Sequence, residues 1–176
     1  MRERMGPIAA PLPHRRLVLT RSMPSRKITN SAEVDGLLAR HGFTAFDLAT
    51  SSIAEQRAAL AEADIVIAVF GSDLLAVLLM QPDTDFIEMK YSSGLASHMD
   101  TMFSACAVNH HLLMCEPAAS PGHQRMKKDS DFTVDCARLS ALLDEIIARK
   151  QRGQARHAPL DIAAQDLPSP SSSPGH

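Results

Sequence analysis

The sequence contains few aromatic residues and few cysteines, and this scarcity excludes several classes of protein. Its 176 residues include six Phe, one Tyr and no Trp, too few for a platform on which sugar rings or single-stranded nucleic acid could stack. The three cysteines, Cys106, Cys115 and Cys136, form no CxxC pair, which argues against a structural zinc site or a full disulfide framework. We therefore expect reduced, partly buried thiols, as in a cytoplasmic protein.

An excess of one charge and a long hydrophobic run are also missing. The formal net charge is −2 and the sequence pI is about 6.4, so the chain has no global signature of nucleic-acid binding. No apolar run approaches the ~20 residues that a membrane span needs, and the N-terminus has no apolar signal core. We expect a cytoplasmic protein with no nucleic-acid partner and no membrane span.

Motifs for the commonest catalytic and cofactor chemistry are absent as well. The chain has no GxGxxG, no Walker loop and no GxSxG, so it does not resemble NAD enzymes, ATP enzymes or serine hydrolases. His110 and His111 are adjacent, and on a strand such neighbours point to opposite faces, so they cannot easily share one metal ion. We expect no metal and no other cofactor, and the sequence identifies no catalytic base or nucleophile.

The most informative segment is residues 63–76, where a buried strand ends at a glycine and a helix follows. The β-branched run Ile65-Val66-Ile67 is typical of a strand covered on both faces. Gly71 permits a sharp turn, and Ser72 can cap the next helix. In an open α/β sheet this turn lies at the carboxyl edge, where ligands bind, and a helix N-terminus there can hold a phosphate.

The rest of the chain alternates between strand and helix patterns. Strands are predicted at 16–20, 43–48, 64–70, 85–90 and 110–115, and helices at 30–42, 52–63, 73–80, 96–106 and 134–150. Two of the helices begin with apparent capping boxes, Asn30 with Glu33 and Ser52 with Glu55. The alternation predicts an α/β fold, a Rossmann-like parallel sheet with helices on both faces and strand 64–70 at its centre. We expect a flexible arm over 1–15, one α/β domain over 16–150 and a disordered tail over 151–176.

Several short segments, taken in order, resemble glycosyltransferase family 61. They are Arg21…Arg26…Asn30-Ser31-Ala32-Glu33, His41-Gly42-Phe43, Ile53-Ala54-Glu55-Gln56, Ala63-Asp64-Ile65-Val66, Gly71-Ser72-Asp73-Leu74 and Phe86-Ile87-Glu88. The resemblance covers residues 16–147 and is to the C-terminal, nucleotide-sugar-binding half of the catalytic region. It implies half of a GT-B type fold, a nucleotide-diphosphate sugar donor, and a glycan or polysaccharide acceptor, as in polysaccharide biosynthesis. It also implies a partner N-terminal half-domain that is missing here.

The resemblance also implies a binding role for five residues. Arg21 and Arg26 follow the first strand and would hold the diphosphate, because guanidinium groups bind phosphate oxygens in a bidentate way. Backbone N–H groups at Gly71 and Ser72 would help to stabilise the departing diphosphate without a metal. Glu88, at the end of the fourth strand, would accept hydrogen bonds from the ribose hydroxyls. From the residues alone, both arginines could instead belong to a solvated turn, and Glu88 could be a charged strand end.

The turn after the third strand departs from the family's pattern. The family typically has His-Gly-Ala-Gly-Leu-Thr/Ser-Asn where this chain has Phe70-Gly71-Ser72-Asp73-Leu74-Leu75-Ala76. Two alternatives therefore stay open beside an active glycosyltransferase. One is a non-catalytic remnant or partner-binding module on the same fold, and the other is an unrelated flavodoxin-like domain.

Overall fold

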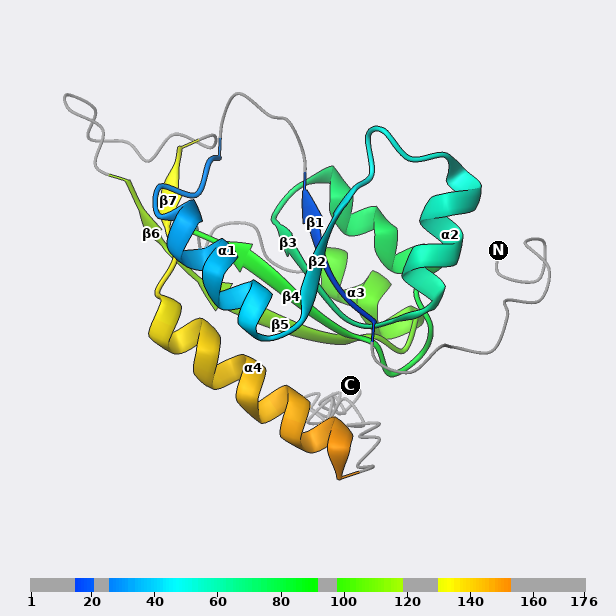
Figure 1. Ribbon diagram of the computed structural model, residues 1–176. Coiled ribbons are helices and arrows are strands. Elements are labelled where there is room, and N and C mark those ends of the chain that lie inside the picture. Colours follow the sequence, from blue (N-terminus) through cyan, green and yellow to red (C-terminus); the bar gives the residue numbers. More distant parts are fainter. Residues whose placement is uncertain (1–14, 21–25, 92–97, 119–129, 153–176) are drawn as a thin grey trace, which may run out of the picture.

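Five parallel strands form the centre of the protein. A computed structural model of the chain describes residues 15–20, 26–91, 98–118 and 130–152 (Figure 1). The arm and tail expected over 1–15 and 151–176 lie outside the described residues, except that Arg15 begins the first strand, Gln151 ends the last helix and Arg152 follows as its C-cap. None of the helices in these described ranges is long and apolar enough to cross a membrane.

The sheet contains the five predicted strands, and the strand predicted at 64–70 lies at its centre. Its strands are β1 (Arg15–Thr20), β2 (Phe43–Asp47), β3 (Ala63–Val69), β4 (Asp85–Lys90) and β5 (Asn109–Met114). Their order is β2-β1-β3-β4-β5 and all four pairings are parallel. The chain first moves outward from β1 to β2 and then crosses over to β3, so the topological switch point lies between β1 and β3. The Rossmann-like α/β prediction is confirmed.

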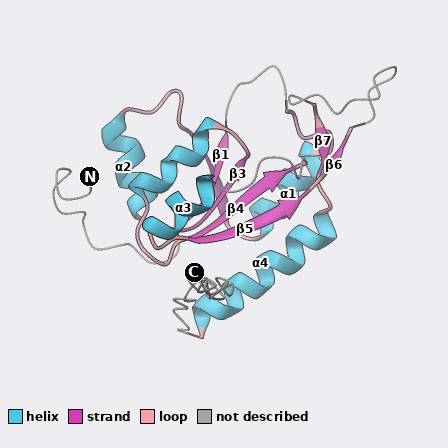
Figure 2. Ribbon diagram, turned by 180° about the vertical axis from the view of Figure 1, so that it is seen from behind, coloured by secondary structure: helices cyan, strands magenta, loops and turns pink. Residues whose placement is uncertain are grey.

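Helices cover both faces of the sheet. The helices α1 (Ser31–Arg40) and α4 (Cys136–Gln151) cover one face, and α2 (Ile53–Ala61), the 3₁₀ helix η2 (Ser72–Leu79) and α3 (His98–Ala105) cover the other (Figures 1 and 2). Ile65, Val66 and Ile67 of β3 are all fully buried, because this strand contributes to the core on both sides. This explains why its sequence shows no polar alternation.

The segment after β3 forms a 3₁₀ helix, whereas the sequence predicted an ordinary helix over 73–80. Leu74 and Val77 are its most deeply buried apolar side chains, and Met80, which directly follows the helix, is also fully buried. Their spacing of three residues aligns them on one face of a helix with three residues per turn, and a 3.6-residue period would rotate them away from the core. The packing of this apolar stripe therefore favours the tighter helix.

A short hairpin was not predicted. The strands β6 (Glu116–Pro117) and β7 (Phe132–Thr133) pair in antiparallel fashion inside a region expected to be a loop over 116–134. Ile28 also forms a parallel bridge with Phe132. Two-residue strands leave no periodic pattern in a sequence, so only the tertiary contacts reveal them.

The two predicted capping boxes have different outcomes. In α2 the Ser52 hydroxyl accepts from the Glu55 N–H at 3.3 Å, and the Glu55 carboxylate accepts from the Ser52 N–H at 2.7 Å, so this box is confirmed. The Asn30 box is wrong, because the Asn30 side chain makes no capping hydrogen bond to α1. It bonds the backbone of Val134 instead. An amide can donate and accept at once, so it can pair with a distant backbone as readily as with its own helix.

Candidate functional site

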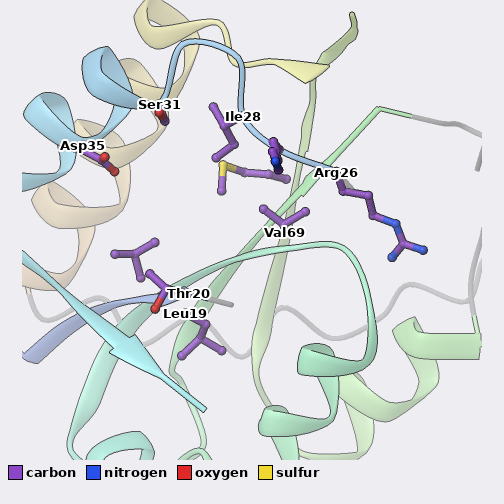
Figure 3. A pocket seen from close by; sticks show the side chains of 10 residues that line it. Leu19, Thr20, Arg26, Ile28, Ser31, Asp35 and Val69 are labelled. Carbon is purple, nitrogen blue, oxygen red and sulfur yellow. The ribbon is translucent and has the colours of Figure 1, made fainter. Parts of the chain in front are cut away.

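A cavity of about 350 Å³ lies at the carboxyl ends of the central strands (Figure 3). Its floor is formed by the ends of β1, β3 and β4, including Val69 and Met89, and one wall by the first turns of α1. This place is the switch point between β1 and β3, where open α/β sheets bind their ligands. The volume falls within the range of about 300–1,000 Å³ that is usual for small-molecule sites.

The lining of the cavity is mostly aliphatic, with polar groups on opposite sides. Val18, Leu19, Ile28, Val69 and Met89 supply the apolar surface. In Figure 3, Asp35 points from α1 on one side of the cavity, and Arg26 extends on the other side toward the turn that follows β3. The cavity therefore lies between Asp35 and Arg26, with apolar walls between them, and the Arg26 guanidinium extends away from the cavity to the turn after β3.

Residues 26–30, which we call the strap, close the cavity on the side away from the sheet (Figure 3). Three hydrogen bonds hold its backbone to the segment before α4. The Lys27 N–H donates to Asp131 Oδ1 at 2.8 Å, the Phe132 N–H donates to the Lys27 carbonyl at 3.0 Å, and the Thr29 N–H donates to the Phe132 carbonyl at 2.8 Å. The position of the strap thus depends on residues more than a hundred positions away in sequence.

Arg26 contacts the turn after β3 twice. Its Nη1 donates to the Phe70 carbonyl at 3.3 Å, and its guanidinium carbon lies 4.4 Å from the centroid of the Phe70 ring. Its backbone has a φ of +60°, a left-handed conformation that is uncommon outside glycine and that often marks functional sites. The loop after the first strand and the turn after the third are therefore neighbours, as expected for parallel strands that end at one edge.

The other predicted phosphate-binding residues are only partly described. Gly71 precedes η2 with a φ of +155°, a backbone conformation that glycine adopts without steric cost. Its carbonyl accepts from the Leu74 N–H at 3.2 Å. Ser72 is the first residue of η2, so its backbone follows directly on the turn that Arg26 contacts. Arg21 lies outside the described residues.

Glu88 does not lie with Arg26. Its side chain is on the face covered by α2, η2 and α3 and is only 4% exposed. It bonds His110 Nε2 at 2.9 Å, while His110 Nδ1 lies 3.1 Å from Asp100 and the imidazole stacks on Phe103. The adjacent Met89 points to the opposite face and lines the cavity. The ribose contact predicted for Glu88 stays a prediction, but the carboxylate at the cavity belongs to Asp35.

Sequence reasoning missed Asp35 for an identifiable reason. Asp35 follows Val34 in α1 and precedes the buried pair Leu37 and Leu38, so it appeared to be an ordinary solvent-facing position of an amphipathic helix. Its place one turn after Ser31, at the end of α1 nearest the carboxyl edge, was the available signal.

The two adjacent histidines point to opposite faces, as predicted. His110 contacts Glu88, whereas His111 Nε2 lies 2.7 Å from Asp85 Oδ1 on the α4 side. Within the described ranges, no group of three or more metal-binding side chains comes together. Cys106, Cys115 and Cys136 are free thiols, and burial raises the pKa of Cys115 to about 11, so this thiol stays protonated and unreactive near neutral pH.

Comparison with known proteins supports the family resemblance over part of the chain. Residues 3–87 match the family model of Glycosyltransferase 61, which confirms the predicted resemblance. The matched region ends inside β4, short of the predicted range of 16–147. It includes Arg26, Gly71, Ser72 and Asp35, and Glu88 follows immediately after it. No curated protein matches the chain.

Proposed function

We propose that this chain is the nucleotide-sugar-binding domain of a glycosyltransferase. It would take a sugar from a nucleotide-diphosphate donor and transfer it to a hydroxyl of a glycan or polysaccharide. The family match over residues 3–87 supports a glycosyltransferase-like role in general. The observation that carries the proposal is the cavity at the switch point of β1 and β3, with Arg26 beside the Gly71 turn.

The polarity of the cavity fits one orientation of the donor. Arg26 and the backbone N–H groups at Gly71 and Ser72 would receive the diphosphate, and the binding role of Arg21 stays a prediction from the sequence. The nucleoside would pack against the aliphatic walls of the cavity. Asp35, on the side away from Arg26, would accept hydrogen bonds from ribose hydroxyls or from the base. Glu88 is the weaker choice for this contact because its side chain is on the other face of the sheet.

The proposed chemistry requires charge stabilisation at the leaving group. When the bond from the sugar to the diphosphate breaks, the diphosphate gains negative charge. Arginines and backbone N–H groups that are already in place stabilise this charge without reorganisation at the moment of reaction. The acceptor and the base that deprotonates it would come from a partner half-domain, and no metal is needed for the leaving-group step.

A second candidate is a nucleotide-binding module that does not transfer sugar. It is favoured by the turn after β3, where Leu75 is 52% exposed and Ala76 is buried at positions where the family pattern has a hydroxyl and an amide. These two side chains offer no polar group to a donor. The two functions share the same binding site and differ only in turnover.

Isothermal titration with a panel of nucleoside diphosphates tests the proposal. We expect wild type to bind one member of the panel, and Arg26→Ala to weaken binding by about 1.5–3 kcal/mol, the range for hydrogen bonds to a charged group. Arg40→Ala is the matched control, because Arg40 lies in the last turn of α1, at the other end of this helix from the cavity. The absence of binding to any member would refute the proposal, and binding without sugar transfer in the presence of its partner half would favour the second candidate.

A further inference from the structure

We propose that Phe70 is a positioning residue, which holds the guanidinium of Arg26 at the place where the diphosphate binds. This inference rests on the proposed function, in which Arg26 contacts the donor. It assigns to the Phe70 ring a role beyond filling the core.

One residue supplies two separate contacts to Arg26. The Phe70 ring lies 4.4 Å from the guanidinium carbon, and the Phe70 carbonyl accepts from Nη1 at 3.3 Å. The face of an aromatic ring carries negative potential and attracts a cation at this separation. The carbonyl and the ring face therefore favour the same location for the positive charge.

An arginine whose side chain is already held in its binding position contributes more to the affinity for a ligand. A mobile arginine side chain has substantial rotamer entropy, part of which is lost when a ligand immobilises it. Arg26 has a left-handed backbone and its side chain extends toward the turn, where it contacts the carbonyl and the ring of Phe70. A guanidinium held over a ring can still donate to phosphate oxygens, because it carries five N–H donors.

Phe70 is itself held in place by a series of contacts that leads back to the strap. Its ring meets Tyr91 edge to face at 5.7 Å, and Tyr91 stacks on Phe132 at 5.6 Å. Phe132 pairs with Ile28 of the strap, which begins with Arg26. The Phe70 N–H also donates to the Met89 carbonyl at 3.0 Å. These contacts lead from Phe70 back to the strap. They therefore fix the position of the Phe70 ring relative to the Arg26 guanidinium.

Fluorinated phenylalanines at position 70 separate the electrostatic role from packing. Mono-, di- and trifluorinated rings have nearly the same size as phenylalanine but a progressively weaker negative face. We expect the affinity for the nucleoside diphosphate that wild type binds to fall with each fluorine, reaching about 5–10-fold for the trifluorinated ring, as for a partly desolvated cation–π contact. The thermal midpoint without nucleotide should also fall by a few degrees, because the ring and the guanidinium are in contact before nucleotide binds. In the Arg26→Ala background the series should be flat, because the coupled partner is gone.

The possible failures are distinguishable. If wild type binds no nucleoside diphosphate, the proposed function and this inference fall together. If wild type binds but the affinity does not depend on fluorination, only the role of Phe70 is refuted. If affinity rises with fluorination, Arg26 must leave the ring in order to bind, and the inference is again overturned.

Discussion

The side chain of Asn30 pairs with both backbone groups of Val134, as a neighbouring strand would. Its Nδ2 donates to the Val134 carbonyl at 2.9 Å, and its Oδ1 accepts from the Val134 N–H at 3.0 Å. The two residues are 104 positions apart. This pair joins the strap and the start of α1 to the segment before α4. The residues of the candidate site that lie within 3–87 are therefore held in place by a part of the chain outside the family match.

Replacing Asn30 should therefore affect both stability and binding. Asn30→Ala leaves the two Val134 backbone groups without their partner and should lower the free energy of unfolding by about 1–3 kcal/mol. It should also weaken nucleotide binding, because the strap that carries Arg26 loses an anchor. Denaturant unfolding and titration calorimetry on the same variant measure both effects.

Ser52→Ala provides the matched control for Asn30→Ala. It removes a helix cap and should cost about 0.5–2 kcal/mol of stability. Since α2 covers the other face of the sheet, nucleotide affinity should stay unchanged. An Asn30→Ala protein that is destabilised but binds normally would show that the strap does not need this anchor.

Two substitutions at Arg26 should separate backbone strain from binding. Arg26→Gly and Arg26→Ala both remove the guanidinium, so both should weaken nucleotide binding equally. At a φ of +60°, however, glycine avoids the cost of roughly 1–2 kcal/mol that a side chain has in the left-handed region. The Gly variant should therefore be more stable than the Ala variant by about 1 kcal/mol, part of the gain being lost to the flexibility of unfolded glycine. Equal stabilities would indicate that the strap relaxes out of the left-handed conformation.

Substitutions of Asp35 and Glu88 test which of these two carboxylates contacts the nucleotide. Asp35→Asn removes a charge at the cavity and should weaken nucleotide binding by about 1.5–3 kcal/mol if the carboxylate accepts from the ribose or the base. It should leave stability nearly unchanged, because Asp35 is exposed. Glu88→Gln should act in the opposite way, with little effect on affinity and a measurable loss of stability from its bond to His110. If only Glu88→Gln lost affinity, the original assignment of the ribose contact to Glu88 would be correct.

The sequence was sufficient for the fold because local signals agreed with one another. The apolar run of β3 and the strand–helix alternation both indicate a parallel sheet, and such a sheet places the ends of β1 and β3 at one edge. This is why Arg26 and the Gly71 turn could be predicted to be neighbours. The face of Glu88 could not be predicted, because every residue of β4 is buried and a strand buried on both sides has no polar alternation that would indicate its faces. The anchoring of the strap by Asp131 and Val134 depends on contacts across the whole chain, which no local pattern encodes.

A buried cluster of charged side chains at the start of β4 should make the stability of the protein depend on pH. Asp85 is 1% exposed and contacts three groups: His111, Arg149 and the Lys150 ammonium, which lies 2.7 Å from Asp85 Oδ2. The same ammonium donates to the Asp83 carbonyl at 2.9 Å. Burial raises the pKa of Asp85, but the hydrogen bonds from His111 and Lys150 and the charges of Lys150 and Arg149 outweigh it. The net pKa lies below the ordinary value of 3.8.

Because the pKa of Asp85 is lower in the folded state, its stabilising effect is present above the unfolded pKa and is lost as pH falls through the folded one. Asp85→Asn should lower the free energy of unfolding by about 1.5–3 kcal/mol at neutral pH, since the cations left behind are partly exposed and can turn toward water. The difference from wild type should stay constant down to about pH 5 and shrink below about pH 4. Asp144→Asn is the control, because that carboxylate is 71% exposed and should change stability by less than about 0.5 kcal/mol. Denaturant melts from acid to neutral pH measure both differences. A difference for Asp85→Asn that persists unchanged in acid would show that the cluster is held by packing and neutral hydrogen bonds, and that the charge of the carboxylate contributes nothing.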